Sequence, residues 1–222
     1  MEPLSIWQDV YQVGGYYISN FNDCSIYLLN GGKELALIDS GVGTSFEKVV
    51  KNIEILGFSP ENIKYVIATH AHIDHIGGLS KFKHMFNSII IAHTLDTDKI
   101  EKGVDVGAEY YGVNYDPCTV DIKIDTEHHT LHVGKHELKL IHIPGHTPGS
   151  IACYVDVKGK RVLFGQDIHG PYSLPGSNPE KARISLKKLI ELESDILCEG
   201  HFGVYKPKHK VKNYIESWLA KI

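Results

Sequence analysis

The sequence predicts a mixed α and β fold in which two β-sheets pack face to face and helices cover them on the outside. Apolar runs alternate with helical patterns in the first half of the chain, whereas strands joined by short turns fill most of the second half. With 222 residues, of which 42% are hydrophobic and 23% charged, the chain is long enough to bury a sizeable core. We expect one globular domain over residues 1–222.

Strands and helices alternate in the first half. Apolar residues at helical spacing predict a helix over residues 44–56, with Thr44 or Ser45 as its N-cap and Gly57 after its end. A second helical pattern covers residues 78–86. Buried-type apolar runs predict strands at residues 6–13, 25–29, 35–38, 65–68 and 88–92.

The second half is richer in strands. A helix is expected over residues 179–192, because Asn178 is a good N-cap and Pro179 suits the first helical position. A last helix is expected over residues 211–219. Residues 102–118, with three glycines and three tyrosines, are expected to form a loop or lid. Strands are predicted at residues 120–124, 136–143, 151–157, 161–164 and 195–198.

Composition and charge exclude several classes of protein. The net charge of −4 argues against a nucleic-acid binder, and no apolar run is long enough for a membrane span. The first residues lack the basic start and apolar core of a signal peptide, so we expect a cytoplasmic protein with a small-molecule substrate. The four cysteines are too widely spaced for a disulfide or thiolate zinc motif and are expected to be buried free thiols: Cys24, Cys118, Cys153 and Cys198.

Potential metal ligands crowd the segment that follows the strand at residues 65–68. His70 and His72 point the same way in an extended segment, so both imidazoles can bind one ion. Asp74 and His75 then face another direction as the chain turns into a helix. Packing these donors together is costly unless a cation binds them, and four ligands in one loop indicate two ions.

Three further candidates also follow predicted strands. His146 lies in the run Gly-His-Thr-Pro-Gly after the strand at residues 136–143. Asp167 and His201 each come just after an apolar run that ends in a glycine-containing segment. Because strand ends carry ligands in α/β sheets, we expect these side chains to complete the metal site.

The combined motif resembles the metallo-β-lactamase superfamily, and within it the hydroxyacylglutathione hydrolase-like branch. The resemblance is carried by His-x-His-x-Asp-His at residues 70–75, the Gly-His-Thr-Pro-Gly run, the aspartate Asp167 and the late Gly-His, and it extends from about residue 20 to 201. It implies an α+β fold of four layers, the αββα sandwich of metallo-β-lactamase-like proteins, with two metals at its edge. It also implies that Asp39, in Ile-Asp-Ser-Gly, supports the metal loop.

The resemblance implies a binuclear hydrolase that acts on a small ester, thioester, lactone or phosphoester through a metal-bridging hydroxide. Asp167 would bridge the ions, and Asp74 would also orient the nucleophile and pass a proton to the leaving group. The expected cofactors are two divalent ions per chain, zinc in the first place, with iron or manganese as alternatives. The implied ligands are His70, His72 and His146 for the first ion, and Asp74, His75 and His201 for the second.

Two other functions stay open at this point. The first is a mononuclear iron persulfide dioxygenase of the same superfamily, which would use His72 or His70 with His146 and Asp167. The second is a non-catalytic zinc protein, whose metal site would be closed rather than open to a substrate. The native metal, the substrate and the existence of a homodimer are not determined by the sequence.

Some residues are candidates for a supporting role only. His93 follows a strand and is expected to support the metal ligands from behind. Aromatic and histidine side chains in the two long loops are candidate walls of a substrate pocket: Tyr110, Tyr111, Tyr115, His169 and Tyr172.

Overall fold

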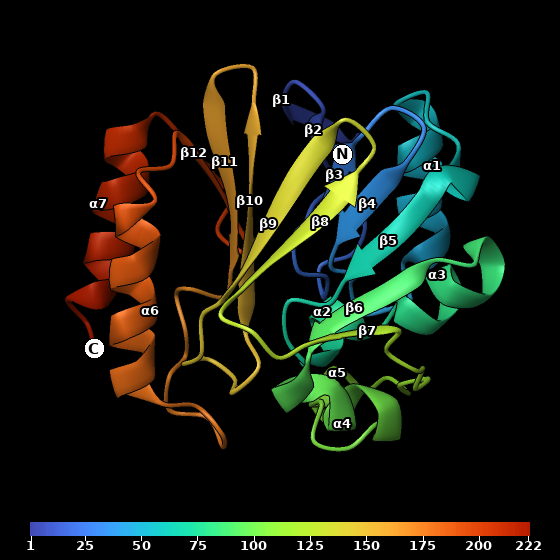
Figure 1. Cartoon of the computed structure of the whole chain (residues 1–222). Coiled ribbons are helices and arrows are strands. Elements are labelled where there is room, and N and C mark those ends of the chain that lie inside the picture. The colour runs from blue at the N-terminus through green and yellow to red at the C-terminus, as the bar shows by residue number, and fades with distance from the viewer.

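Two β-sheets pack against each other at the centre of the molecule, and helices cover the outer face of each (Figure 1). The computed structural model describes residues 1–222. The four layers run helix, sheet, sheet, helix across Figure 1. This architecture confirms the predicted α+β sandwich.

The first sheet has seven strands in sequence order. Its early strands are antiparallel, and each neighbouring pair from the fourth strand to the seventh is parallel. Parallel strands end at the same edge of a sheet, so the loops that follow them lie together. The strands are β1 (Leu4–Trp7), β2 (Val10–Gly14), β3 (Ile26–Asn30), β4 (Leu35–Ile38), β5 (Ile63–Ile67), β6 (Ile89–His93) and β7 (Ile122–Ile124).

The second sheet has six strands in the order β13-β12-β11-β10-β9-β8. Only β11 and β12 are parallel neighbours, so the segments after both strands also share one edge. The strands are β8 (His128–Val133), β9 (His136–His142), β10 (Ile151–Val157), β11 (Lys160–Gln166), β12 (Ile196–Glu199) and β13 (Val204–Tyr205).

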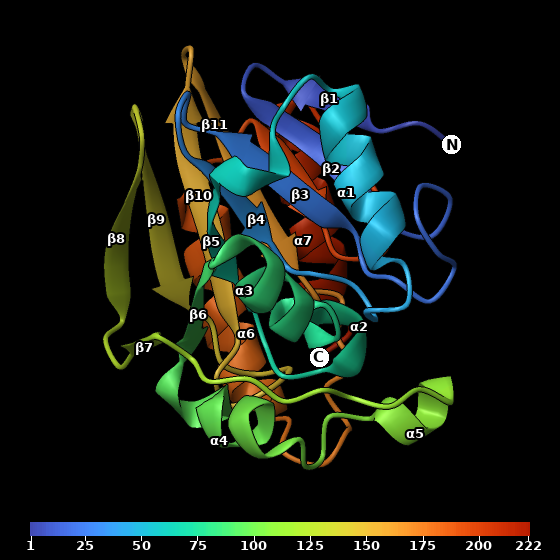
Figure 2. The same ribbon diagram turned by 90° about the vertical axis from the view of Figure 1, so that its right-hand side faces the viewer.

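Helices of the first half cover the first sheet, and two late helices cover the second (Figures 1 and 2). Asn178 caps α6 as predicted, because its side chain accepts the N–H of Lys181 at 2.9 Å. Ser45 is the N-cap residue of α1, as predicted, but its hydroxyl makes no cap hydrogen bond and instead donates to Asp23. The helices are α1 (Phe46–Ile55), the 3₁₀ turn η1 (Pro60–Asn62), α2 (Ile73–Ile76), α3 (Leu79–Phe86), α4 (Thr94–Lys102), α5 (Ala108–Tyr111), α6 (Pro179–Glu191) and α7 (Lys208–Leu219).

Three apolar layers hold the sandwich together. One lies between the two sheets, where Tyr27 and Ile38 meet Phe164 and Cys198. A second lies between the first sheet and α1, α3 and α4, and a third between the second sheet and α6 and α7. Burial of apolar surface is the main favourable contribution to folding, and here it also fixes the two sheet edges against each other.

The structure corrects several predicted elements. Residues 6–13 form two strands rather than one, because the chain turns at Asp9, which has a φ of 64°. The strand at residues 120–124 belongs to the first sheet, where it pairs with β6. Residues 102–118 contain α5, a helix that was not predicted.

Four further elements were not predicted because they are short or have few apolar residues: η1, α4, β8 and β13. α7 also begins at Lys208, before the predicted start, since its polar first turn carries no apolar pattern. Sequence periodicity detects only elements whose buried face is well marked.

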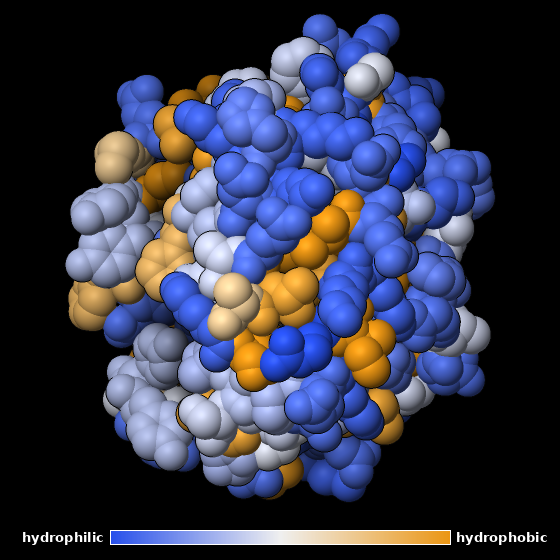
Figure 3. Space-filling model, turned by 90° about the vertical axis from the view of Figure 1, so that its left-hand side faces the viewer, coloured by the Kyte–Doolittle hydropathy of each residue, from blue (hydrophilic) through white to orange (hydrophobic).

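The outer face of α6 and α7 carries a strip of apolar surface bordered by hydrophilic side chains (Figure 3). Leu189, Ile190, Val211 and Ile215 line a groove between the ends of these helices. None of the helices is long and apolar enough to span a bilayer. The four cysteines are buried free thiols, as predicted.

Candidate metal centre

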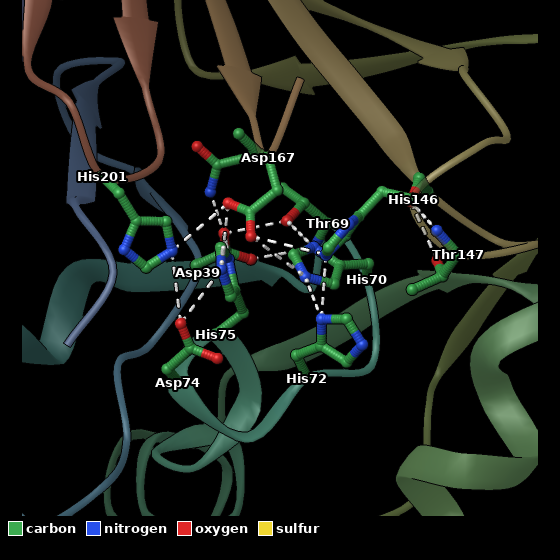
Figure 4. Close-up of polar contacts among 12 residues, drawn as sticks. Asp39, Thr69, His70, His72, Asp74, His75, His146, Thr147, Asp167 and His201 are labelled. Atoms are coloured by element: carbon green, nitrogen blue, oxygen red, sulfur yellow. Dashed lines mark hydrogen bonds and ion pairs between the residues drawn. The ribbon is translucent and has the colours of Figure 1, made fainter. Parts of the chain in front are cut away.

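The side chains expected to bind metal meet at one edge of the sandwich, where strand ends of both sheets face each other (Figure 4). Four come from the loop and helix after β5, one from the segment between β9 and β10, and one each from the segments after β11 and β12. The structure places all seven in two adjoining groups: His70, His72, Asp74, His75, His146, Asp167 and His201.

The first group consists of three imidazoles and one carboxylate oxygen. His72 Nδ1 lies 3.1 Å from His70 Nε2 and 2.9 Å from His146 Nε2. Asp167 Oδ2 lies 3.4 Å from His146 Nε2 and 3.8 Å from His70 Nε2. Donor atoms about 2.0–2.1 Å from a tetrahedral zinc ion stand roughly 3.3 Å from one another. The four atoms therefore have the spacing that a single ion requires.

The second group shares Asp167 with the first. Asp74 Oδ2 lies 3.5 Å from His75 Nε2 and 3.3 Å from His201 Nε2. Asp167 Oδ1 lies 3.3 Å from His75 Nε2 and 3.4 Å from His201 Nε2. The two oxygens of Asp167 therefore face different groups, Oδ2 the first and Oδ1 the second.

Hydrogen bonds on the outer sides of the rings decide which nitrogen faces the site. His75 Nδ1 lies 2.6 Å from Asp39 Oδ2, and because a carboxylate only accepts, this nitrogen carries the proton. His146 Nδ1 likewise donates to the carbonyl of Pro171 at 3.1 Å. With each Nδ1 held as a donor, Nε2 is the atom that both rings direct at their group, and it is the atom that would bind a metal ion.

Asp39 links the metal loop to the strand ends of both sheets. It is fully buried, and it accepts the backbone N–H and the hydroxyl of Thr69, each at 2.8 Å, and the amide of Gln166. The Thr69 hydroxyl in turn lies 3.2 Å from His70 Nδ1. The structure thus gives Asp39 the contacts that its predicted supporting role requires.

Unpartnered buried atoms show that the site fits a cation. His75 Nε2 and Asp167 Oδ1 are buried and have no hydrogen-bond partner. Polar atoms buried without a partner are costly, and both atoms face the second group. An ion held by this group would satisfy both.

The charge state of the first group suits metal binding. Burial and the neighbouring His146 lower the pKa of His72 to about 4. Burial, with His75 and His72, holds the pKa of His70 well below its usual range. Both rings are therefore neutral at pH 7, and neutral imidazole is the form that coordinates metal.

The second group combines two buried carboxylates with two imidazoles. Although burial opposes a charged imidazole, the carboxylates of Asp167 and Asp74 raise the pKa of His201 to about 10. Burial likewise opposes a charged Asp167, yet His75 and His201 hold the pKa of this carboxyl well below its usual range. Two buried carboxylates in such a small volume attract a cation.

Close backbone approaches explain two of the glycines in the motifs. Gly77 has ordinary helical angles, but a Cβ there would clash with the backbone of Val42. Gly200 lies against Asp167, so a side chain at this position would clash with the Asp167 carboxylate. Both glycines let neighbouring loops close around the site.

Asp96 is a supporting residue that the sequence did not indicate. It is fully buried in the first turn of α4 and accepts the N–H of Ala71 at 3.0 Å, the hydroxyl of Thr147 at 2.6 Å and the N–H of Gly149 at 2.8 Å. It therefore ties the loop that carries His70 and His72 to the loop that carries His146. A single aspartate after a strand has no distinctive spacing, and only its position before a helical turn could have drawn attention to it.

We expect Asp96→Ala to lower the free energy of unfolding by about 3 kcal/mol, because two backbone N–H groups lose their buried acceptor. Metal affinity should fall by roughly tenfold or more, as is usual when the support of a ligand loop is removed. Denaturant unfolding and metal titration measure the two effects. Asp98→Ala, on the exposed side of the same helix, is the matched control and should leave both unchanged. Unaltered metal affinity in Asp96→Ala would contradict this supporting role.

Glu199 is a second supporting residue that the sequence did not indicate. Its fully buried carboxylate accepts the N–H of His201 at 2.6 Å and of Phe202 at 2.8 Å. It also lies 2.6 Å from Nδ1 of His169. Glu199 thereby orients the backbone that presents His201, and it explains the position of His169 beside that ring.

The candidate pocket residues take different positions. Tyr111 lies beside Asp74, where burial and that carboxylate raise the pKa of its phenol. Tyr115 packs on the core and donates to the carbonyl of Ile100, whereas Tyr110 is exposed. Tyr172 lines a small pocket together with three members of the first group, His70, His146 and Asp167. Its hydroxyl donates to the carbonyl of Ile168.

His93 supports the site only indirectly. Its ring stacks on His142 with centroids 3.8 Å apart, and its Nδ1 accepts the N–H of Leu95 at the start of α4. His142 Nε2 donates to the carbonyl of Pro148 at 2.9 Å. His93 therefore caps the helix that carries Asp96, and its support of the site passes through that helix.

Comparisons with known proteins agree with the geometry. A family model described as the metallo-beta-lactamase superfamily matches residues 19–201. An uncharacterised protein of Aquifex aeolicus is 32% identical over 81% of this chain and 84% of its own length. Hydroxyacylglutathione hydrolase GloC of Haemophilus influenzae is 27% identical over 82% of this chain and 86% of its own. The crystal structure of the metallo-beta-lactamase GOB-18 from Elizabethkingia meningoseptica superposes with a TM-score of 0.80 over 100% of this chain and 89% of that chain, at 26% identity.

Proposed function

The chain belongs to the metallo-beta-lactamase superfamily, and we propose that it is a binuclear hydrolase of a small ester, thioester, lactone or phosphoester. Its class, a metal-dependent hydrolase, follows from the family and from relatives such as the hydroxyacylglutathione hydrolase. The number of ions and the bond that is cleaved are the proposal. The observation that carries it is Asp167, whose two oxygens face two separate donor groups.

The two groups divide the ligands between two ions. His70, His72 and His146 would hold the first, and Asp74, His75 and His201 the second, with Asp167 between them. Two divalent ions, when bound, lower the pKa of a shared water to near neutrality and polarise the oxygen of the scissile bond. Imidazole and carboxylate donors suit zinc first, with iron or manganese as alternatives.

Asp74 has a second role in this proposal. Burial opposes its charge, but His75 and His201 lower the pKa of this carboxyl, so that it is ionised at neutral pH. An ionised carboxylate beside the reacting atoms can accept a proton from the nucleophile and pass it to the leaving group. Its backbone is fixed because the carbonyl of Asp74 accepts the N–H of Cys24 at 3.3 Å.

The alternatives make different demands on the same residues. A persulfide dioxygenase with one iron needs two histidines and one carboxylate, and it has no use for the complete second group. A structural zinc site is closed, whereas His72 is half-buried and His201 is exposed, so that solvent reaches the site here. Both observations favour the binuclear hydrolase.

Metal content tests the proposal directly. Protein purified without chelator or nickel is expected to hold two divalent ions per chain by plasma mass spectrometry. Removal of these ions should abolish hydrolysis and lower the unfolding temperature, because ligands that bind only the folded state stabilise it. Added zinc should restore both. One iron per chain, together with oxygen uptake in the presence of a persulfide, would instead establish the dioxygenase.

The proposal also includes the kind of binding partner and the cellular location of the protein. A small-molecule substrate without a nucleic-acid or membrane partner is supported by the net charge of −4. The four free buried thiols support a cytoplasmic location, since disulfides are rare there. A homodimer is compatible with the proposal and is not required by it.

A further inference from the structure

Four loops are joined to the segments that carry the candidate ligands, and we name them the rim: residues 15–25, 104–115, 170–178 and 201–203. The N–H of Ile73, beside Asp74, donates to the carbonyl of Val106 at 2.8 Å. The N–H of Ser25 donates to the carbonyl of Gly200, next to His201, at 2.6 Å. The third loop accepts a hydrogen bond from His146 through Pro171, and the fourth contains His201 itself. Figure 2 shows α5, part of the second loop, projecting outward below α2.

Every loop of the rim exposes at least one large apolar side chain. Single exposed apolar residues are common on protein surfaces, but here at least one lies on each of the four loops that are joined to the ligand segments. The exposed fractions are 69% for Tyr17, 68% for Phe21, 86% for Tyr110, 41% for Leu174 and 57% for Phe202.

The charges of the rim are as informative as its apolar side chains. None of the four loops contains a lysine or arginine. Their only carboxylates are Asp23, which is buried and bonded to Ser45, and the exposed Asp105 and Glu109. Apart from His201 at the metal site, the rim therefore offers no side-chain cation to a phosphate or carboxylate on the substrate.

One wall of the rim is held rigidly. Phe202 packs edge-on against His169, with ring centroids 4.7 Å apart, and stacks with Trp218 at 6.3 Å. It directly follows His201 in the chain, and both residues are exposed. A substrate chain that extends from the metal site on this side would lie against an ordered aromatic surface.

We propose that the rim binds the apolar acyl chain of a neutral ester or lactone, so that long-chain neutral substrates are preferred over short-chain or phosphorylated ones. This inference rests on the proposed hydrolase function. Moving each methylene from water onto apolar side chains favours binding. We expect kcat/KM to rise roughly two- to fourfold for each methylene that the rim covers.

The test uses the zinc-loaded protein and lactones that share one ring. γ-Butyrolactone has no alkyl chain on this ring, whereas γ-octalactone carries a butyl and γ-dodecalactone an octyl chain. Methyl p-nitrophenyl phosphate serves as the anionic counterpart. The ratio of kcat/KM for γ-dodecalactone over γ-butyrolactone should exceed roughly 30. The triple variant Phe21→Ser, Tyr110→Ser, Leu174→Ser should reduce this ratio to near one. Met85→Ser, an equally exposed side chain outside the rim, should retain the wild-type ratio.

Failure of the inference can be told apart from failure of the proposed function. A flat chain-length profile, or faster cleavage of the phosphodiester, would overturn the inference and leave the hydrolase in place. If the loaded protein cleaved none of these compounds, the proposed function would fail as tested. Lactone affinities measured by calorimetry would then test whether the rim binds an alkyl chain. γ-Dodecalactone should still bind more tightly than γ-butyrolactone to the metal-free protein, and the triple variant should lose this preference; equal affinities would overturn the inference.

Discussion

Asp167→Asn is expected to reduce kcat/KM by about 10³-fold or more, which corresponds to about 4 kcal/mol of transition-state stabilisation. The carboxylate presents Oδ2 to one donor group and Oδ1 to the other, so one substitution removes a ligand from both. An asparagine has the same shape but carries no charge, and its NH₂ would face imidazole nitrogens or a cation. Metal content should fall from two ions per chain to one or none.

The control for this prediction is Asp156→Asn. Asp156 is an exposed carboxylate on β10 that pairs with Arg161, at 2.8 Å between Oδ1 and Nε, and it belongs to neither donor group. Exposed ion pairs contribute little, so this variant should keep full activity and both ions. Full activity with two bound ions in Asp167→Asn would refute the bridging role.

Asp39→Asn is expected to weaken binding of the second ion by roughly 10- to 100-fold. Asp39 Oδ2 now accepts the proton of His75 Nδ1 at 2.6 Å. The amide NH₂ of asparagine at that position would be a donor, so His75 would have to move its proton to Nε2, the atom that faces the second group. A protonated Nε2 cannot bind metal. Buried donors of Thr69 and Gln166 would also lose part of their acceptor, which lowers stability by about 3 kcal/mol.

Asp121→Asn separates this effect from general destabilisation. Asp121 accepts the N–H of Ile90 at 2.8 Å and the ammonium of Lys83 at 2.6 Å, outside the metal centre. Its substitution should lower stability while both ions stay bound. Metal titration by calorimetry and denaturant unfolding measure the two quantities for each variant. Undiminished affinity for the second ion in Asp39→Asn would show that Asp39 does not set the tautomer of His75.

The regular elements were predictable wherever one face is strongly apolar. Strands β4, β5 and β6 read as continuous apolar runs because they are buried on both faces. By contrast, β8 begins with two histidines and has only two fully buried residues, and α4 is polar over most of its surface. Such elements form because neighbouring segments pack on them, and a local pattern does not contain that information.

The sequence also did not allow us to predict which strand belongs to which sheet. Residues 122–124 come after a long connection and before a run of antiparallel strands, so their position in the chain favoured the second sheet. They pair instead with Ile91, Ala92 and His93 of β6. Pairing depends on contacts between segments that are distant in sequence, and these form only in the folded chain.

The sequence by itself determined the donor types and the fold class. Histidines and aspartates within six residues share a site for local reasons, since successive side chains of an extended segment and a helical turn cannot lie far apart. Only the tertiary structure decided which oxygen of Asp167 faces which group, that Asp96 and Glu199 hold the ligand loops, and that Tyr111 rather than Tyr115 lies beside Asp74. These relations are hydrogen bonds and contacts between loops far apart in the chain, and the packing of the two sheets brings those loops to one edge.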